Sequence, residues 1–294
     1  MLCEKYGLQI VHKFQLGNVC KAVFRVQDLA GNTLVLKVGT DARGMAEIRR
    51  NKIGYDKLIS LGLDSFIPRI HAYEINDFFA VLLMEDCGED VLTQIKKSDN
   101  PAKLYDLITE GIEPVYRRSK RQGADGSNMI QSVQKKIKEQ YQTHLRSPFD
   151  PEGCLEAQIR SMDAFIDHVS VPFFCFSNWD FTPDDVYLTT DGIKYSDPHE
   201  EVTGNPIIDM ACFAGVAVAH GLPGSVEAYG RIEAFAIQRV ADILEIDEHI
   251  ASKLFFLGRI LQCFLSTRFR GKEFPEQAKQ LFAEARIYLE KVTA

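Results

Sequence analysis

The sequence lacks a C-x-x-C pair and a long uncharged apolar run, and each absence excludes a class of protein. Its seven cysteines are odd in number and scattered over 294 residues, so neither a zinc ribbon nor a thioredoxin-type redox motif is supported. No apolar run approaches the roughly 20 residues that span a bilayer. The start, "MLCEKYGLQIVHKF", lacks the basic region and apolar core of a signal peptide. We therefore expect a cytoplasmic protein with free thiols and no membrane partner.

An excess of positive charge is also missing. The chain has 34 lysines and arginines against 41 aspartates and glutamates, which gives a net charge of −7. A nucleic-acid-binding protein normally carries a basic excess, so we expect no nucleic-acid partner. The shares of hydrophobic residues, 46%, and charged residues, 26%, are typical of a globular protein. The length predicts two lobes or domains rather than one small core.

The first ninety residues predict strands interrupted by one helix. In residues 44–62, Met45, Ile48, Tyr55, Leu58 and Ile59 fall at helical spacing. Runs rich in β-branched and aromatic residues, bounded by turn signals, predict five strands, within residues 8–15, 20–28, 32–40, 67–75 and 78–85. This pattern indicates a small antiparallel lobe with one helix after its third strand.

From residue 90 onward the pattern is helical. Residues 117–128 are basic and then contain glycine and serine, which indicates an exposed loop. Helices are expected near residues 102–118, 129–144, 153–169, 206–221, 224–243, 247–268 and 275–292. The predicted class is therefore α+β, with a small β-rich lobe at 1–86 and a larger, mainly helical lobe at 87–294.

Between these helices, "FSNWDFTPDDVYLTTDGIKYSDP" gathers aspartates around a tight turn. Asp191-Gly192, flanked by strand formers, predicts a two-residue hairpin loop. Counting back from that loop pairs Val186 with Asp197, which leaves Asp185 one residue from the position opposite Asp197. Cross-strand neighbours have Cβ atoms roughly 4.5–5.5 Å apart, and diagonal neighbours remain within reach. The two carboxylates are therefore expected to lie close together.

Two interpretations of this acidic hairpin follow. Carboxylates that close repel each other unless a cation or proton lies between them, and Mg²⁺ takes one or two carboxylates plus substrate phosphates. On this interpretation Asp180, on the loop that enters the hairpin, is placed to act as a base toward a substrate hydroxyl. The other interpretation is an acidic turn whose side chains point to solvent, since aspartate is common in turns. The local pattern leaves both open.

The order of these features resembles the catalytic core of the protein-kinase-like fold, in the form found in the aminoglycoside phosphotransferase and choline kinase group. That group carries a His-Gly-Asp-x-x-x-x-Asn loop and then a strand that ends in Asp; here the matching segments are "NWDFTPDD" and "YSDP". The resemblance implies that Asp180 is the catalytic base, Asp185 takes the Asn position and Asp197 is the principal Mg²⁺ ligand. The segment "GNPIIDMACFAG" resembles the next family segment, which implies that Asp209 braces the catalytic loop.

The first lobe supplies a lysine in "LVLKV". Lys37 lies on the same strand face as Thr33 and Val35, and taken alone it would be an ordinary solvated lysine. The resemblance implies that Lys37 holds the α- and β-phosphates of ATP and forms an ion pair with Glu47.

The segment "VLLMEDCGED" resembles the hinge of the same family. That likeness implies that Met84 lines the back of the adenine site. It also implies that the backbone carbonyl of Glu85 and the N–H of Cys87 face the edge of the base.

Three departures separate this chain from the family pattern. Asn178-Trp179 replaces His-Gly, Asp185 replaces Asn, and the phosphate-covering loop has one glycine, Gly17. The resemblance implies an ATP- and Mg²⁺-dependent phosphotransferase that acts on a hydroxyl of a small molecule. The alternative is a nucleotide-binding pseudokinase that regulates a partner. A protein kinase is disfavoured because Asp209 follows Asp197 by only twelve positions, too few for an activation segment. The acceptor is left open among aminoglycosides, choline, sugars and amino alcohols.

Overall fold

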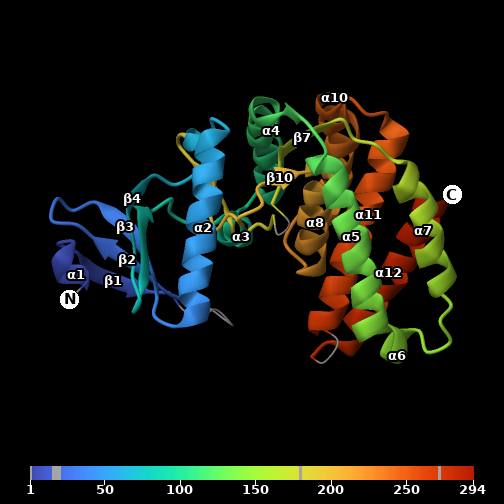
Figure 1. The fold of residues 1–294 in the computed structure, drawn as a ribbon, viewed down its shortest axis with the longest axis horizontal. Coiled ribbons are helices and arrows are strands. Elements are labelled where there is room, and N and C mark those ends of the chain that lie inside the picture. The colour runs from blue at the N-terminus through green and yellow to red at the C-terminus, as the bar shows by residue number, and fades with distance from the viewer. Residues whose placement is uncertain (1, 15–20, 179–180, 271–272) are drawn as a thin grey trace. The chain divides into compact units, whose positions relative to one another are not determined.

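The computed structural model describes residues 2–14, 21–178, 181–270 and 273–294 (Figure 1). The chain divides into two units, the first made of Met1–Asp90 and Asp185–Val202, the second of Val91–Asp184 and Thr203–Ala294. The hairpin that carries Asp185 and Asp197 thus belongs to the first unit, whereas the predicted division grouped it with the helical lobe.

The first unit contains the predicted five-stranded antiparallel sheet. Its strand order is β1-β2-β3-β5-β4, with helix α2 inserted after the third strand. The strands are β1 (Gln9–Lys13), β2 (Lys21–Gln27), β3 (Thr33–Gly39), β4 (Ile70–Ile75) and β5 (Ala80–Glu85). The helices are α1 (Leu2–Lys5), α2 (Ala42–Ser60) and the short 3₁₀ turn η1 (Asp64–Phe66). The predicted strands and long helix are confirmed, whereas α1 and η1 carry too few residues for a periodic signal.

Helix α2 starts directly after β3, and local chemistry sets that corner. The Asp41 carboxylate accepts a hydrogen bond from the Gly44 backbone N–H at 2.7 Å, which caps the first turn. A Cβ on Gly39 would lie 2.4 Å from the backbone of Gly44, so only glycine permits this close approach. The corner lays α2 alongside the sheet (Figure 1), where it packs against β3 and β5.

The hairpin β8 (Val186–Thr189) and β9 (Gly192–Tyr195) forms at the predicted place but in a different register. Val186 pairs with Tyr195 rather than with Asp197, and Thr189 pairs with Gly192. The predicted register is wrong because Gly192 is not part of the loop. With a φ of 114°, a value that L-residues avoid, it opens the return strand after Thr190 and Asp191.

This error of two residues does not change which face each side chain takes, because side chains alternate with a period of two. The ladder extends by a hydrogen bond from the Ser196 N–H to the Asp185 carbonyl at 2.9 Å. In the extended register Asp185 still lies one position from the residue opposite Asp197. The hairpin is anchored in its unit by Tyr195, which is fully buried and stacks on Phe66 with ring centroids 6.0 Å apart.

The second unit is mainly helical, as predicted. In Figure 1 its helices run side by side, and α11 packs against α12, α8 and α5. The helices are α3 (Val91–Lys97), α4 (Pro101–Ser119), α5 (Asp125–Gln140), α6 (Arg146–Phe149), α7 (Glu156–His168), α8 (Pro206–Ala219), α9 (Ser225–Ala234), α10 (Ala241–Leu244), α11 (Glu248–Arg270) and α12 (Pro275–Thr293), with π-helical turns η2 (Tyr141–Leu145) and η3 (Phe235–Val240). The helix predicted near 224–243 is thus continuous through α9, η3 and α10.

Three short strands in the second unit were not predicted. They are β6 (Arg121–Gln122), β7 (Phe173–Phe176) and β10 (Thr203–Gly204), in the order β10-β7-β6. The expectation of an exposed loop at 117–128 is therefore wrong in part, because α4 continues to Ser119, β6 pairs with β7 and α5 begins at Asp125. Pairing of these two-residue strands depends on partners roughly 30 to 50 residues away, which no local pattern reveals.

The expectation that no segment has the dimensions of a membrane span is wrong for helix α11. Among the described residues, Glu248–Phe269 is long and apolar enough by length and composition. Its most apolar window has a mean hydropathy of 1.2, although charged residues such as Arg259 interrupt the apolar run. Of its most apolar window, 67% is buried inside the structure, which is typical of a core helix in a soluble protein.

A buried carboxylate organises the turn between α6 and α7. Asp150 is 7% exposed and accepts hydrogen bonds from the Tyr141 hydroxyl at 2.7 Å and from the backbone N–H groups of Cys154 at 2.9 Å and Leu155 at 2.8 Å. Burial raises the pKa of this carboxyl, but the hydroxyl and the N–H groups stabilise the charged form more, and the pKa is lowered overall.

Asp150→Asn is expected to lower the free energy of unfolding by about 2 kcal/mol at neutral pH, because a charged acceptor is lost from three donors. The folded pKa is lower than the unfolded one, so the contribution of Asp150 is complete above the ordinary value of 3.8 and is lost as pH falls through the folded pKa. Urea unfolding should therefore show the gap between wild type and variant closing in acid. The exposed Glu152→Gln is the control, and a gap independent of pH would contradict the assignment.

Candidate active site

The site starts from one face of β3. Leu34 and Leu36 point into the apolar core of the sheet, so Lys37 lies on the opposite face. Cross-strand partners share a face, and Val35 on this side pairs with Met84 of β5. The Met84 sulfur accepts a hydrogen bond from the Tyr55 hydroxyl of α2 at 3.8 Å. Lys37 therefore lies on the face of the sheet that α2 covers.

Lys37 forms an ion pair with Asp197. Its side chain is almost entirely buried, and its Nζ contacts Oδ1 of Asp197, whose side chain is 30% exposed. The interpretation of Lys37 as an ordinary solvated lysine is therefore wrong. Burying an unpaired ammonium group costs several kcal/mol, so a partner carboxylate is what permits the lysine to lie there. The predicted phosphate-binding lysine and the predicted metal-binding aspartate meet at one point.

The backbone at Asp197 adopts a conformation unusual for its residue type. Its φ is 55°, in the left-handed region, which costs most L-residues about 1 kcal/mol and is tolerated better by aspartate than by most. Its N–H donates to the Tyr55 hydroxyl at 3.2 Å. Such conformations persist only where the surroundings hold them, and they cluster at functional sites.

Asp185 is half-buried and its carbonyl pairs with Ser196, as described above. Within the described part of the chain, no group of three or more histidine, cysteine, aspartate or glutamate residues is arranged to hold a metal. Mg²⁺ does not need such a cluster, because it binds through one or two carboxylates together with water and substrate phosphates. The hard oxygen donors of Asp185 and Asp197 fit that ion, whereas a zinc site would need nitrogen or sulfur ligands.

The predicted hinge begins at Met84, which is buried at the end of β5. Cys87 lies three positions further along the hinge. Burial raises the pKa of the Cys87 thiol to about 12, so the thiol is protonated at neutral pH. The predicted contacts of Met84, of the Glu85 carbonyl and of the Cys87 N–H with an adenine ring stay predictions.

Two ion pairs hold this hinge in the first unit, and the sequence did not reveal them. Glu85 accepts from Lys194 Nζ of β9 at 2.6 Å and from the Arg69 backbone N–H at 2.9 Å. Partial burial raises the pKa of Glu85, but these donors outweigh it and the pKa is lowered. Arg25 Nε of β2 donates to Asp86 at 2.6 Å. The side chain of Glu85 is thus occupied, and its backbone N–H donates to the Arg69 carbonyl at 2.9 Å.

Glu47 lies in the second turn of α2 and is half-buried. The structure gives Lys37 a carboxylate partner that the sequence did not predict, Asp197. The predicted ion pair between Glu47 and Lys37 stays a prediction.

Residues 178–184 of the loop "NWDFTPDD" belong to the second unit. Trp179 and the predicted base, Asp180, lie outside the described residues, as does Gly17 of the phosphate-covering loop. At the start of the loop, the Asn178 N–H donates to Asp209 Oδ2 at 2.5 Å, and both residues are buried. Asp209 is in the first turn of α8, so the expected brace from a helix N-terminus is present.

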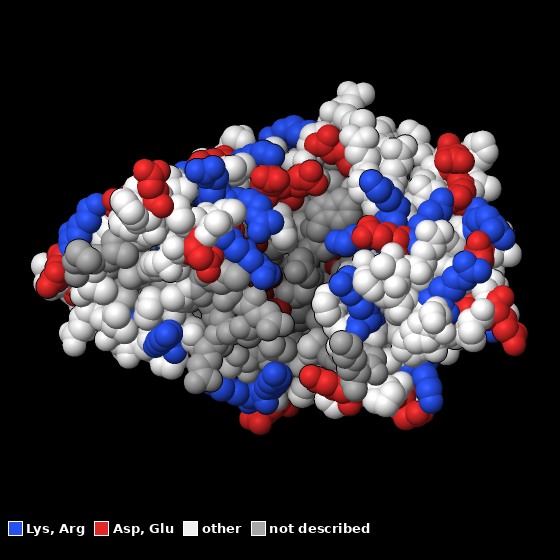
Figure 2. All heavy atoms as spheres, turned by 60° about the horizontal axis from the view of Figure 1, so that its bottom comes forward, with Lys and Arg blue, Asp and Glu red and all other residues white. Residues whose placement is uncertain are grey.

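The basic run at 117–121 has acidic partners within its own unit. Arg117 pairs with Glu113 at 2.7 Å, and Lys120 pairs with Glu245 at 2.6 Å. On the face shown in Figure 2, lysine and arginine side chains lie intermixed with aspartate and glutamate. This distribution favours a solvated, mutually neutralised surface.

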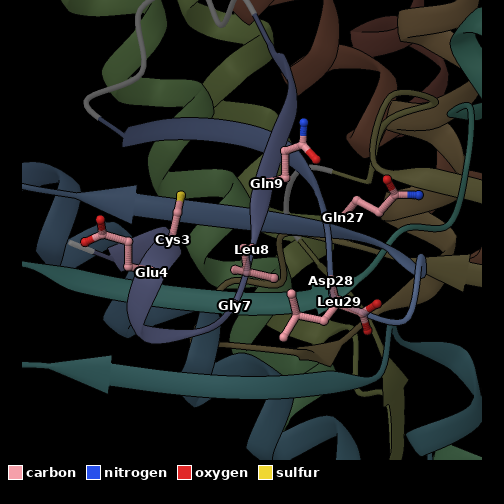
Figure 3. A pocket seen from close by; sticks show the side chains of 8 residues that line it. All are labelled: Cys3, Glu4, Gly7, Leu8, Gln9, Gln27, Asp28 and Leu29. Carbon is pink, nitrogen blue, oxygen red and sulfur yellow. The ribbon is translucent and has the colours of Figure 1, made fainter.

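A pocket of about 440 Å³ lies elsewhere in the first unit, at the β1 edge of the sheet (Figure 3). It is lined by Cys3, Glu4, Gly7, Leu8, Gln9, Gln27, Asp28 and Leu29. None of the predicted nucleotide or metal residues lines it. The Asp28 carboxylate accepts from the backbone N–H groups of Ala30 at 2.9 Å and Asn32 at 2.8 Å, so it closes its own turn.

Three residues of α2 also contact the Asp197 segment and were not predicted as site residues. Asn51, Gly54 and Tyr55 lie at i, i+3 and i+4, which places them on one helix face. A buried asparagine and a glycine inside an amphipathic helix are the available sequence signal, because each weakens an isolated helix. The contact itself joins segments over 140 residues apart, which no local pattern predicts.

No protein-family model and no curated protein sequence matches the chain. Solved structures match nearly all of it. A choline kinase from Streptococcus pneumoniae is 15% identical with a TM-score of 0.57, covering 98% of this chain and 97% of that chain. An amicoumacin kinase in complex with AMP-PNP, Ca²⁺ and amicoumacin is 12% identical with a TM-score of 0.57, covering 99% of this chain and 92% of that chain.

An aminoglycoside phosphotransferase from Streptomyces rimosus, in complex with ADP and streptomycin, is 13% identical with a TM-score of 0.51, covering 89% of this chain and 96% of that chain. The chain has the fold of these small-molecule kinases. The predicted protein-kinase-like architecture is thereby confirmed, as is the resemblance to the aminoglycoside phosphotransferase and choline kinase group at the level of fold. At this identity the likeness concerns fold alone, and the chemistry depends on the residues described above.

Proposed function

We propose that this protein is an ATP- and Mg²⁺-dependent phosphotransferase that moves the γ-phosphate to a hydroxyl of a small molecule, in the cytoplasm. The observation that carries the proposal is the contact between Lys37 and Asp197. A solvated lysine and an acidic turn would have no reason to meet across 160 residues of sequence. Paired in a largely buried position, they bring together a cation suited to phosphate and a carboxylate suited to Mg²⁺.

Each residue then has one task. Lys37 binds the α- and β-phosphates, and Glu47 orients it. Asp197 and Asp185 hold Mg²⁺, which when bound neutralises charge on the transferred phosphoryl group. Asp180 accepts or orients the proton of the acceptor hydroxyl. Phosphoryl transfer depends mainly on positioning and charge neutralisation, so a rigid arrangement of these few groups accounts for the chemistry.

Nucleotide binding and acceptor turnover are tested in sequence. Thermal unfolding with ATP, with and without Mg²⁺, is expected to show stabilisation that depends on the metal. Solved relatives of this fold bind streptomycin and amicoumacin, so a panel of aminoglycosides, choline, sugars and amino alcohols is then assayed for ATP turnover. Absence of any nucleotide-dependent stabilisation would contradict the proposed function.

Asp180→Ala is expected to lower kcat by a factor on the order of 10² or more, because general base catalysis is lost. Nucleotide stabilisation should be unchanged, since Asp180 is not assigned to the nucleotide. Asp184→Ala, an exposed acid in the same loop with no assigned role, is the matched control. Nucleotide binding without turnover of any acceptor, unaffected by Asp180→Ala, would instead favour the pseudokinase that Asn178-Trp179 suggests.

A further inference from the structure

The segment that carries Asp197 lies directly on helix α2. Asn51 Nδ2 donates to the Pro198 carbonyl at 3.1 Å, and the Tyr55 hydroxyl accepts the Asp197 N–H at 3.2 Å. Tyr55 is fully buried and Asn51 is 6% exposed. Two buried polar side chains one helical turn apart therefore bind the 196–197 and 198–199 peptide units of the same segment. Buried polar groups need hydrogen-bond partners, so α2 and the 197–199 segment both depend on this contact.

Gly54 makes this approach possible. A Cβ at Gly54 would lie 2.2 Å from the His199 carbonyl oxygen and 2.9 Å from the Pro198 Cβ. The first of these atoms belongs to the backbone, so a methyl group there would have to move the chain itself. Because glycine weakens a helix interior, its presence here fits a need for backbone contact.

The contact between α2 and the 197–199 segment lies at Asp197, whose left-handed backbone conformation has to be held by its surroundings. Asp197 has a φ of 55°, and the hairpin ladder has ended before it. On its N-terminal side, Ser196 is still fixed to Asp185, whereas beyond it the chain is held by α2. The direction of the Asp197 carboxylate, and hence its contact with Lys37, depends on the contact between α2 and the 197–199 segment.

We propose that Asn51, Gly54 and Tyr55 form a positioning cradle on α2 that sets the Asp197 carboxylate for Mg²⁺-nucleotide. This inference rests on the proposed function, since it concerns the same site. The three residues touch neither nucleotide nor metal; they act through the backbone of residues 197–199. Disturbing the cradle should therefore weaken the part of nucleotide binding that depends on Mg²⁺ and leave the metal-free part in place.

Calorimetric titration with ADP, in Mg²⁺ and in EDTA, separates these parts. Gly54→Ala and Tyr55→Phe are expected to weaken ADP binding in Mg²⁺ at least tenfold and binding in EDTA less than threefold. Gly230→Ala is the matched control for glycine, because among the described residues no atom outside its own stretch of helix lies within 4 Å of its added Cβ. Tyr105→Phe is the control for tyrosine, because its buried hydroxyl has no hydrogen-bond partner among the described residues.

Hydrogen exchange of the peptide covering 196–200, without nucleotide, tests the cradle independently of function. Both cradle variants should exchange there at least tenfold faster than wild type, and both controls should match wild type. Unchanged exchange, or an equal loss of ADP affinity with and without Mg²⁺, would overturn the inference. If wild type binds no ADP at all, the proposed function fails, and exchange alone then decides whether α2 holds the Asp197 segment.

Discussion

Asp197→Asn is expected to lower kcat by a factor on the order of 10³, because the variant loses the charge that holds the metal against the transferred phosphate. It should also lower the free energy of unfolding by about 2 kcal/mol, since Lys37 would keep its buried charge and lose its ion pair with Asp197. That figure is below the usual cost of breaking a buried pair because Asp197 is 30% exposed. Steady-state turnover and urea unfolding measure the two effects.

The double variant Lys37→Met/Asp197→Asn separates these two roles. Removing both charges should restore stability to within about 1 kcal/mol of wild type, because no ammonium group is then left buried at this position. Activity should stay as low as in either single variant. Asp184→Asn, which removes an exposed acid nearby, should change neither quantity. Full turnover in Asp197→Asn, or recovery of turnover in the double variant, would contradict the assignment.

Gly215→Ala is expected to destabilise the second unit by about 2–3 kcal/mol, or roughly 5–10 °C in Tm. A Cβ at Gly215 of α8 would lie 1.5 Å from Arg259 Nη1 and 2.5 Å from Gln262 Oε1. Arg259 is 1% exposed, and its guanidinium lies 5.2 Å from the ring centroids of both Tyr229 and Tyr288. The arginine therefore has no room to move aside. Differential scanning calorimetry measures the loss.

The control and the rescue for this prediction come from the same unit. Gly230→Ala, with open space around its added Cβ, should be neutral or stabilising by up to about 1 kcal/mol, the intrinsic helical gain of alanine over glycine. Adding Arg259→Met to Gly215→Ala should recover part of the lost stability, because the flexible, uncharged side chain can yield. A Gly215→Ala protein as stable as wild type would show that Arg259 can rearrange.

Much of the fold could be predicted because its signals are local. The alternation in "NTLVLKVGT" and the helical spacing of residues 44–62 each describe a segment that buries one face, and both elements form where expected. The hairpin shows the limit of local counting. Asp191-Gly192 correctly marks a turn, but the positive φ of Gly192 places the glycine in the strand and shifts the register by two.

By itself, the sequence predicted which chemical groups the proposed site contains and determined their order along the chain, from Lys37 through Asp185 to Asp197. It could do so because residue type and spacing limit the chemistry that a segment can support. Only the tertiary structure decided that Lys37 pairs with Asp197 and that Asn51, Gly54 and Tyr55 hold the chain beside it. Those contacts join residues more than 140 positions apart, and the packing of α2 against the segment that follows β9 sets them. Neither segment specifies that packing alone, because each local pattern is satisfied by many arrangements in space.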